Sequence, residues 1–225
     1  MPGNCVLYYI TARTAFPGDE LGRRRRLLEK IGQAARCAVD YIQLREKDLS
    51  ARELESLARE AVSIVRSNSK QNGYLRTRIL VNSRTDVAIT TGADGVHLRA
   101  ADVSPADVRT MWRMGAGAFE RENAPAEPQV GVSCRSVDDV ARAAAAGGNF
   151  AVFAPVFEKN NVPGSHAAGL EALRAACRSG LPVLALGGIT LENAQSCLDV
   201  GASGIAAIRL FQDGDIAAVV KKLRR

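Results

Sequence analysis

The sequence predicts one (β/α)8 TIM barrel that occupies residues 1–225 as a single domain. Short apolar runs alternate with amphipathic stretches of helical period, an alternation typical of a parallel sheet covered by helices. The chain has 225 residues, of which 47% are hydrophobic and 5% aromatic. Its length is that of one barrel, and its many small aliphatic residues suit strands buried on both faces. Eight units in this length favour a closed barrel over an open doubly wound sheet.

The predicted elements follow one another in regular order. The strands are expected at Cys5–Ala12, Tyr41–Glu46, Arg78–Ser83, Gly95–Arg99, Gln129–Cys134, Phe150–Val156, Pro182–Gly188 and Gly204–Phe211. The helices are expected at Arg23–Ala38, Ala51–Ser67, a short stretch up to Gly92, a stretch from Ser104, Ser136–Ala146, Leu170–Arg178, Leu191–Val200 and Asp215–Leu223. Ser50 is a good N-cap, and Pro105 fits a first helical turn.

Composition excludes several classes of protein. The net charge is +6, with one Trp and no aromatic residue among the arginines at 23–26, so we expect no nucleic-acid binding. Five cysteines without CxxC spacing indicate neither a zinc site nor a disulfide framework, and reduced thiols favour a cytoplasmic location. We expect no signal peptide and no membrane span. A homo-oligomer is left open.

Two connections exceed the minimal length. Gly115–Pro128 follows a predicted helix, so we expect a surface excursion at the amino-terminal face of the barrel, which rarely carries chemistry. Phe157–Ala168 follows the sixth strand and contains Gly and Pro, so it is a candidate lid over the functional face.

The strongest functional signal is the segment QLREK after the second strand. Gln43, Arg45 and Lys47 share one face because side chains alternate along a strand. An amide, a planar guanidinium and a compact ammonium together suit a phosphate or pyrophosphate. The alternative is ordinary surface alternation at a strand end.

A second anion site is indicated after the seventh and eighth strands. Gly187 and Gly188 let backbone N–H groups approach a phosphate, and Ile208 and Arg209 follow at the end of the eighth strand. A plain tight turn is the alternative for the glycine pair.

Other polar residues at strand ends are Asn82, Asp102 and Ser133. Asp102 could hold magnesium together with substrate oxygens, or it could simply cap a helix. His97 is expected to be a satisfied core histidine. With two histidines in the chain, no histidine metal cluster is expected.

The motifs QLREK, GADGVHL and GGIT, in that order, resemble the thiamine phosphate synthase superfamily, which also contains a thiazole tautomerase of the TenI type. The resemblance covers nearly the whole chain, from YYIT through VNSRTDVAITTGADGVHL, GVSCRS and APVF to LALGGITLENAQSCLDVGASGIAAI. It implies a transferase of thiamine biosynthesis that joins a hydroxymethylpyrimidine diphosphate to a thiazole phosphate and releases pyrophosphate. Small phosphorylated heterocycles are then the expected ligands.

The resemblance also implies roles for individual residues. Gln43, Arg45 and Lys47 match pyrophosphate ligands, and Asp102 matches a ligand of a magnesium ion that would bind weakly and with help from the substrate. The remaining matches are to the pyrimidine substrate (Asn82, Ser133) and to the thiazole phosphate (Gly187, Gly188, Ile208, Arg209).

Several positions depart from the family pattern. Ser83 stands where the family has an Asp that binds metal, and the loop after strand six lacks the TxTK pattern, with Lys159 as its nearest cation. We therefore include Lys159 with Arg45 and Lys47 as catalytic candidates. Arg135 replaces the histidine that shuttles protons in the tautomerase, and an arginine is no base near neutral pH. These departures leave three hypotheses: a synthase, weakened or altered in substrate; a TenI-like or other enzyme for a related phosphorylated heterocycle; or a non-catalytic phosphate-binding barrel.

Overall fold

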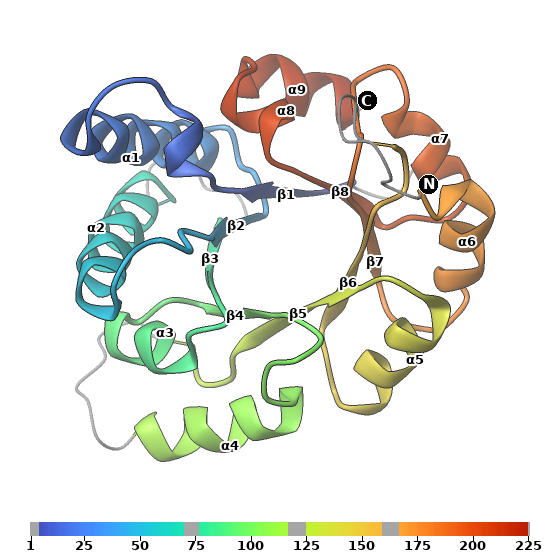
Figure 1. Ribbon diagram of the computed structural model, residues 1–225, viewed down its shortest axis with the longest axis horizontal. Helices are drawn as coiled ribbons and strands as arrows, with labels where there is room; N and C mark the ends of the chain where they lie inside the picture. Colours follow the sequence, from blue (N-terminus) through green and yellow to red (C-terminus); the bar gives the residue numbers. More distant parts are fainter. Residues whose placement is uncertain (1–4, 70–76, 117–124, 159–166, 225) are drawn as a thin grey trace.

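The computed structural model is a closed barrel of eight parallel strands that neighbour one another in chain order, with the helices outside (Figure 1). The structure describes residues 5–69, 77–116, 125–158 and 167–224. It confirms the predicted (β/α)8 architecture. The barrel closes where β1 pairs with β8, and Val6 stands opposite Gly204 in that pairing.

The strands are short, and each is followed by at least one helix. The strands are β1 Val6–Ile10, β2 Tyr41–Leu44, β3 Arg78–Asn82, β4 Gly95–Leu98, β5 Gln129–Cys134, β6 Phe150–Phe153, β7 Val183–Ala185 and β8 Gly204–Ala207. The helices are α1 Glu20–Arg36, α2 Ala51–Ser69, α3 Thr85–Thr91, α4 Pro105–Ala116, α5 Val137–Ala145, α6 Gly169–Ala176, α7 Ala194–Asp199, α8 Arg209–Gln212 and α9 Ile216–Leu223, with a 3-10 turn η1 at Arg13–Ala15. None of these described helices has the length and apolar character needed to cross a bilayer.

Two boundaries differ from the sequence-based prediction in an informative way. Helix α1 begins before Arg23 because Asp19 caps it, with its carboxylate accepting from the Gly22 N–H at 2.8 Å. The run Gly204–Phe211 is not one strand. The strand ends at Ala207, and Phe211 and Gln212 then donate backbone hydrogen bonds to the Ile208 carbonyl in α8. An apolar run alone cannot distinguish a buried strand from a buried helical turn.

The apolar side chains form two concentric layers. One fills the barrel interior, and its members are Tyr8, Ile10, Leu80, Phe150, Val152, Leu184 and Ala206. The other lies between the strands and the helices and includes the fully buried Trp112 and Phe153. Because the interior is packed and not open, ligand binding is confined to the ends of the barrel.

Candidate functional site

The residues expected from the sequence gather at the carboxyl ends of the strands. Gln43 at the end of β2 donates its side-chain amide to the Asn82 Oδ1 at the end of β3, at 3.0 Å. Asn82 in turn donates to the Ser83 hydroxyl at 3.0 Å. Neighbouring strands therefore join these side chains into one hydrogen-bonded row.

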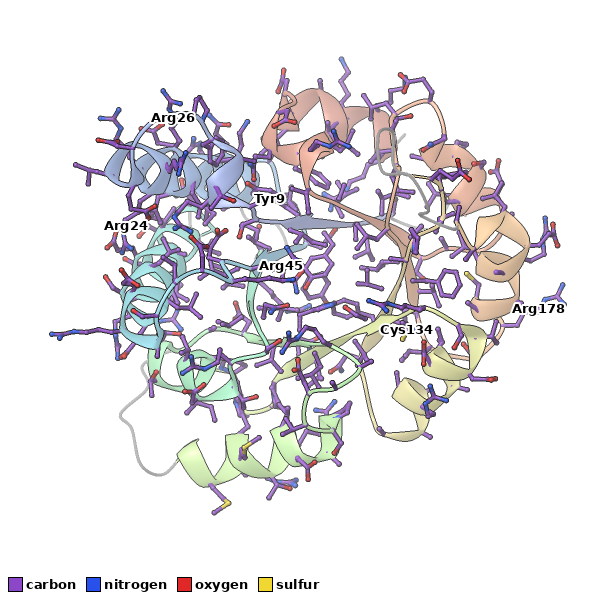
Figure 2. All side chains as sticks on the ribbon, in the orientation of Figure 1. Tyr9, Arg24, Arg26, Arg45, Cys134 and Arg178 are labelled. Carbon is purple, nitrogen blue, oxygen red and sulfur yellow. The ribbon has the colours of Figure 1, made fainter. Side chains whose placement is uncertain are left out.

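Three cations lie at this part of the barrel, and we call Arg45, Lys47 and Arg99 the cationic edge. Arg45 is half-buried and extends from the end of β2 toward the barrel axis (Figure 2). The positive charge of Arg45 is the main cause that lowers the pKa of Lys47, and burial and the charge of Arg99 lower it further. Like charges gathered in this way favour a bound anion between them.

Arg99 was not among the residues expected at the site. It follows β4, two positions after His97, and the alternation of side chains along a strand could have identified it. Its guanidinium forms an ion pair with Asp102 at 3.0 Å.

A partly buried ion network supports the segment that carries the cationic edge. Arg13, after β1, is 3% exposed and contacts three carboxylates: Glu46 at 3.2 Å, Asp48 at 2.7 Å and Glu20 at 2.6 Å. Glu46 and Asp48 alternate with the cations of QLREK, so this network fixes the backbone that carries Arg45 and Lys47. Sequence reasoning missed Arg13, which has no neighbouring motif to mark it.

Thr11 completes this support. Its hydroxyl donates to Glu46 at 2.5 Å and accepts from the backbone N–H of Arg45 at 3.0 Å. Burial raises the pKa of Glu46 above its ordinary value, although hydrogen bonds from Thr11 and Arg13 oppose that rise. The end of β1 is thereby fastened to the segment that follows β2.

A chain of three polar side chains lies below the cationic edge inside the barrel. The Tyr8 hydroxyl is 3.0 Å from His97 Nδ1, and His97 Nε2 is 2.8 Å from the Ser133 hydroxyl. Burial, assisted by the charge of Arg45, lowers the pKa of His97 to about 3, so the ring is neutral. This bears out the expectation of a satisfied core histidine for His97.

The direction of donation along this chain follows from Tyr8. Tyr8 is fully buried, and His97 is its hydrogen-bond partner among the described residues. If Tyr8 donates to Nδ1, then Nε2–H donates to Ser133, and no buried hydroxyl hydrogen is left without an acceptor. The Ser133 hydroxyl hydrogen is then free to donate to a ligand.

The opposite side of the barrel has a cavity of about 590 Å³ at the ends of β7 and β8. Gly187 and Gly188 line it with φ of +99° and +64°. A Cβ on Gly187 would lie 2.8 Å from Pro155 Cβ, and one on Gly188 would lie 2.6 Å from the Glu158 carbonyl oxygen. Glycine is therefore required at both positions for conformation and for space.

The backbone around this cavity is held in place and has donors available. Asn193 donates its side-chain amide to the Gly188 carbonyl at 2.9 Å. In the part of the chain that the structure describes, no hydrogen bond uses the N–H groups of Gly187, Gly188 or Ile208. We call Gly187, Gly188, Ile208 and Arg209 the glycine edge.

Arg209 lies in the first turn of α8 and not at the end of a strand as the sequence suggested, because β8 ends at Ala207. Its side chain is exposed and lines the same cavity. Glu158, Glu192 and Asp213 line the cavity too, so the charge around Arg209 is mixed.

The donor set does not by itself fit a magnesium ion. The Asp102 side chain is only 9% exposed and is already engaged by the backbone N–H of Arg99 at 2.7 Å and by its guanidinium. Burial opposes ionisation of Asp102, but hydrogen bonds from Arg99 and Ser83 outweigh it and keep its pKa below the ordinary value. Among the described residues, no three His, Cys, Asp or Glu side chains come together as a metal cluster.

Three expectations fall wholly or mostly outside what the structure describes. Lys159 lies outside the described residues, as does most of the candidate lid, 157–168. Most of the connection 115–128 also lies outside them, although Trp112 donates its indole N–H to the Pro125 carbonyl at 3.1 Å.

A larger groove, of about 780 Å³, lies between α1 and α2 on the outer surface. It is lined by Leu21, Leu28 and several charged side chains, far from the strand ends. The strand ends combine convergent cations, free backbone donors and polar rows, so the functional site is placed there.

Comparisons with known proteins match nearly the whole chain. A family model described as thiamine monophosphate synthase matches residues 7–211. A thiamine-phosphate synthase of Methanoculleus marisnigri is 34% identical over 97% of this chain and 93% of its own length. One of Chlorobium luteolum is 36% identical over 80% of this chain and 77% of its own. A thiamine phosphate pyrophosphorylase structure from Pyrococcus furiosus superposes with a TM-score of 0.75 at 25% identity, covering 99% of this chain and 95% of that one.

Proposed function

The chain belongs to the thiamine monophosphate synthase family, and from this premise we propose that it joins a hydroxymethylpyrimidine diphosphate to a thiazole phosphate. In this transfer the bond between the pyrimidine methylene carbon and a diphosphate oxygen breaks, and its electron pair leaves with pyrophosphate. The lone pair of the thiazole nitrogen forms the new carbon–nitrogen bond. The observation that supports the proposal most strongly is the pair of anion-binding edges at one end of the barrel.

The cationic edge would bind the diphosphate. Arg45 and Lys47 would neutralise the charge that grows on the departing oxygen, which is the main electrostatic task when a carbocation-like pyrimidine leaves. The Gln43–Asn82 row and the Ser133 hydroxyl would orient the substrate beside them. Lys159 would add a further cation after β6.

The glycine edge would bind the thiazole phosphate. Backbone N–H groups of Gly187, Gly188 and Ile208 would donate to its oxygens, and the Arg209 guanidinium would add a charge. The two anions would then be held on opposite sides of the cavity, with their organic portions facing each other over the apolar interior.

Magnesium would bind only weakly in this proposal, with Asp102 as its protein ligand and with diphosphate oxygens from the substrate. We also propose a cytoplasmic location, in line with five free thiols.

A second candidate is a barrel that binds these ligands but catalyses another reaction or none. It is favoured by the engagement of Asp102 with Arg99 and by Ser83 at the position of a family metal ligand.

The test is an assay for thiamine phosphate from the two heterocyclic substrates in the presence of magnesium. We expect product formation, and Lys159→Ala should reduce turnover while leaving thiazole phosphate affinity unchanged. A purified, folded protein that binds both substrates without forming product would contradict the proposed synthase and leave the second candidate. Arg25→Ala, on the exposed face of α1, serves as the charge-matched control.

A further inference from the structure

The pair formed by Arg99 and Asp102 follows β4, and the resemblance to the family implies that Asp102 is a magnesium ligand. Asp102 accepts from Nε at 3.3 Å and from Nη2 at 3.0 Å. A guanidinium has five N–H donors in a planar fork, and these contacts use one edge of it. The described contacts leave Nη1 unused, and the side chain as a whole is 58% exposed.

The charge of Arg99 acts on the same group as the charge of Arg45, the ammonium of Lys47. Its charge contributes to lowering the pKa of Lys47, as the charge of Arg45 does. Arg99 and Asp102 line a cavity of about 250 Å³ together with Ser133. Asp139 and Arg142 line the cavity too, so Arg99 is oriented by one carboxylate and lies open to a cavity of mixed charge at the end of β4.

The side chains that would hold a metal ion are poor ligands here, because Asp102 is engaged by Arg99 and its neighbour Ser83 carries no charge. Ser83 contributes a hydroxyl where a second carboxylate would be needed, and it hydrogen-bonds to Asp102. Magnesium demands several unengaged oxygen ligands at close to octahedral geometry. A guanidinium can instead bind a phosphate through two parallel hydrogen bonds without any metal.

We propose that Arg99, oriented by Asp102, supplies at this site the positive charge that a metal ion would otherwise bring, so that the chain binds a diphosphate without magnesium. The identity of the organic substrate rests on the proposed function. The binding of inorganic pyrophosphate does not, and it can be measured separately.

The experiment is calorimetric titration with inorganic pyrophosphate, first in EDTA and then with magnesium chloride. We expect the unaltered protein to bind pyrophosphate in EDTA, with magnesium changing the dissociation constant by less than about threefold. Arg99→Gln should weaken binding in EDTA by about tenfold or more, as expected for a lost charge-assisted hydrogen bond.

Arg84→Gln is the matched control. Arg84 also follows a strand end at the same face of the barrel and pairs with a nearby carboxylate, that of Asp86. It should leave pyrophosphate affinity within about twofold. Binding that requires magnesium in the unaltered protein, or equal losses in the Arg99 and Arg84 variants, would overturn the proposal.

A double variant tests the exchange of arginine for metal directly. Arg99→Gln with Ser83→Asp releases Asp102 and adds a second carboxylate, so pyrophosphate binding should become at least about tenfold stronger with magnesium than in EDTA. A folded double variant that stays indifferent to magnesium would contradict the exchange. If pyrophosphate binds as expected but no thiamine phosphate forms, the proposed function fails and this inference stands.

Discussion

The cationic edge after β2 and β4 and the glycine edge after β7 and β8 lie at the same end of the barrel and present positive charge in different ways. The cationic edge uses side chains. Asp102 orients the guanidinium of Arg99, and Glu46 and Asp48, which alternate with Arg45 and Lys47, are held by Arg13. The glycine edge relies mainly on main-chain N–H groups exposed by left-handed backbone at Gly187 and Gly188. The first design needs a supporting ion network, whereas the second needs the absence of a Cβ.

This difference determines how each edge tolerates substitution. Side-chain charges can be exchanged one at a time, as we propose for Ser83 and Arg99. A backbone site allows no such exchange, because a Cβ on Gly188 would lie 2.6 Å from the Glu158 carbonyl oxygen. Function at the cationic edge can therefore diverge while the glycine edge stays constant.

The largest expected effect comes from removing the support of the cationic edge. Arg13→Ala leaves the carboxylate of Glu46, which is 2% exposed, without its guanidinium partner. Losing one partner of a buried ion pair costs about 3–5 kcal/mol, which urea unfolding would measure. Pyrophosphate affinity should fall as well, and phosphate binding at the glycine edge should not.

Arg24→Ala is the control for this change. Arg24 pairs with Glu60 across the exposed faces of α1 and α2, and such pairs contribute about 0–1 kcal/mol. Equal losses of stability from the two variants would show that the buried network has no special role.

The second prediction concerns His97, the ionisable side chain in the polar chain below the cationic edge. Burial, followed by the charge of Arg45, lowers the pKa of His97 to about 3, while an unfolded chain would titrate it near 6.5. Between these values only the unfolded state takes up a proton. This contribution to stability is therefore complete above pH 6.5 and is lost as pH falls.

The loss amounts to about 1.4 kcal/mol per pH unit for one such group. Unfolding free energies at pH 6.5 and 4.5 should therefore differ by about 2–3 kcal/mol more in the unaltered protein than in His97→Asn. Tyr8→Phe keeps the histidine and should keep the difference. A pH dependence that is the same in His97→Asn would mean that the ring is protonated in the folded protein.

The ion network of Arg13 and the hydrogen-bonded chain through His97 also show how far sequence reasoning reached. The barrel, and the placing of QLREK and the glycine pair at the carboxyl ends of its strands, followed from alternation, length and the residue types themselves. Arg13 could not be foreseen, because its partners Glu46 and Asp48 are 33 and 35 residues away and meet it only through the pairing of β1 with β2. Arg99 could have been found from its alternation with His97.

The boundary at β8 shows a different limit. The run from Gly204 to Phe211 is apolar except for Arg209, and both a strand and a helical turn can bury such apolar residues. Only the hydrogen bonds to the Ile208 carbonyl reveal the change to α8. Arg209 was consequently assigned to the correct side of the barrel but to the wrong element.

The third prediction separates the two edges by their ligands. Arg45→Ala should weaken pyrophosphate binding by about 1.5–3 kcal/mol, the value of a hydrogen bond to a charged group. Gly188→Ala should weaken binding of a thiazole phosphate by about 1–3 kcal/mol, the cost of a side chain in left-handed backbone. Each variant should leave the other ligand's affinity within about twofold. Both ligands would be titrated against both variants. If each variant lost affinity for both ligands, the two edges would form a single shared site.

The smallest expected effect lies beside the cationic edge, at Ser83, whose backbone conformation is typical of the glycine edge. Ser83 has φ of +60°, which is uncommon for a residue other than glycine. Asn visits this region more readily than Ser because its short amide can hydrogen-bond locally. Ser83→Asn should therefore raise the free energy of unfolding by about 0.5–1 kcal/mol, as part of a left-handed strain of about 1–3 kcal/mol is relieved.

Ser83→Ala is the comparison that separates strain from hydrogen bonding. Alanine keeps the strained backbone and removes the hydroxyl that accepts from Asn82 at 3.0 Å, so it should be less stable than the unaltered protein. Urea unfolding should rank the variants Asn above Ser above Ala. If Asn instead ranks below Ser, the hydrogen bonds that the Ser83 hydroxyl makes with Asn82 and Asp102 outweigh the backbone strain. The segment beside the cationic edge would then depend on side-chain contacts even at a residue whose φ is typical of glycine.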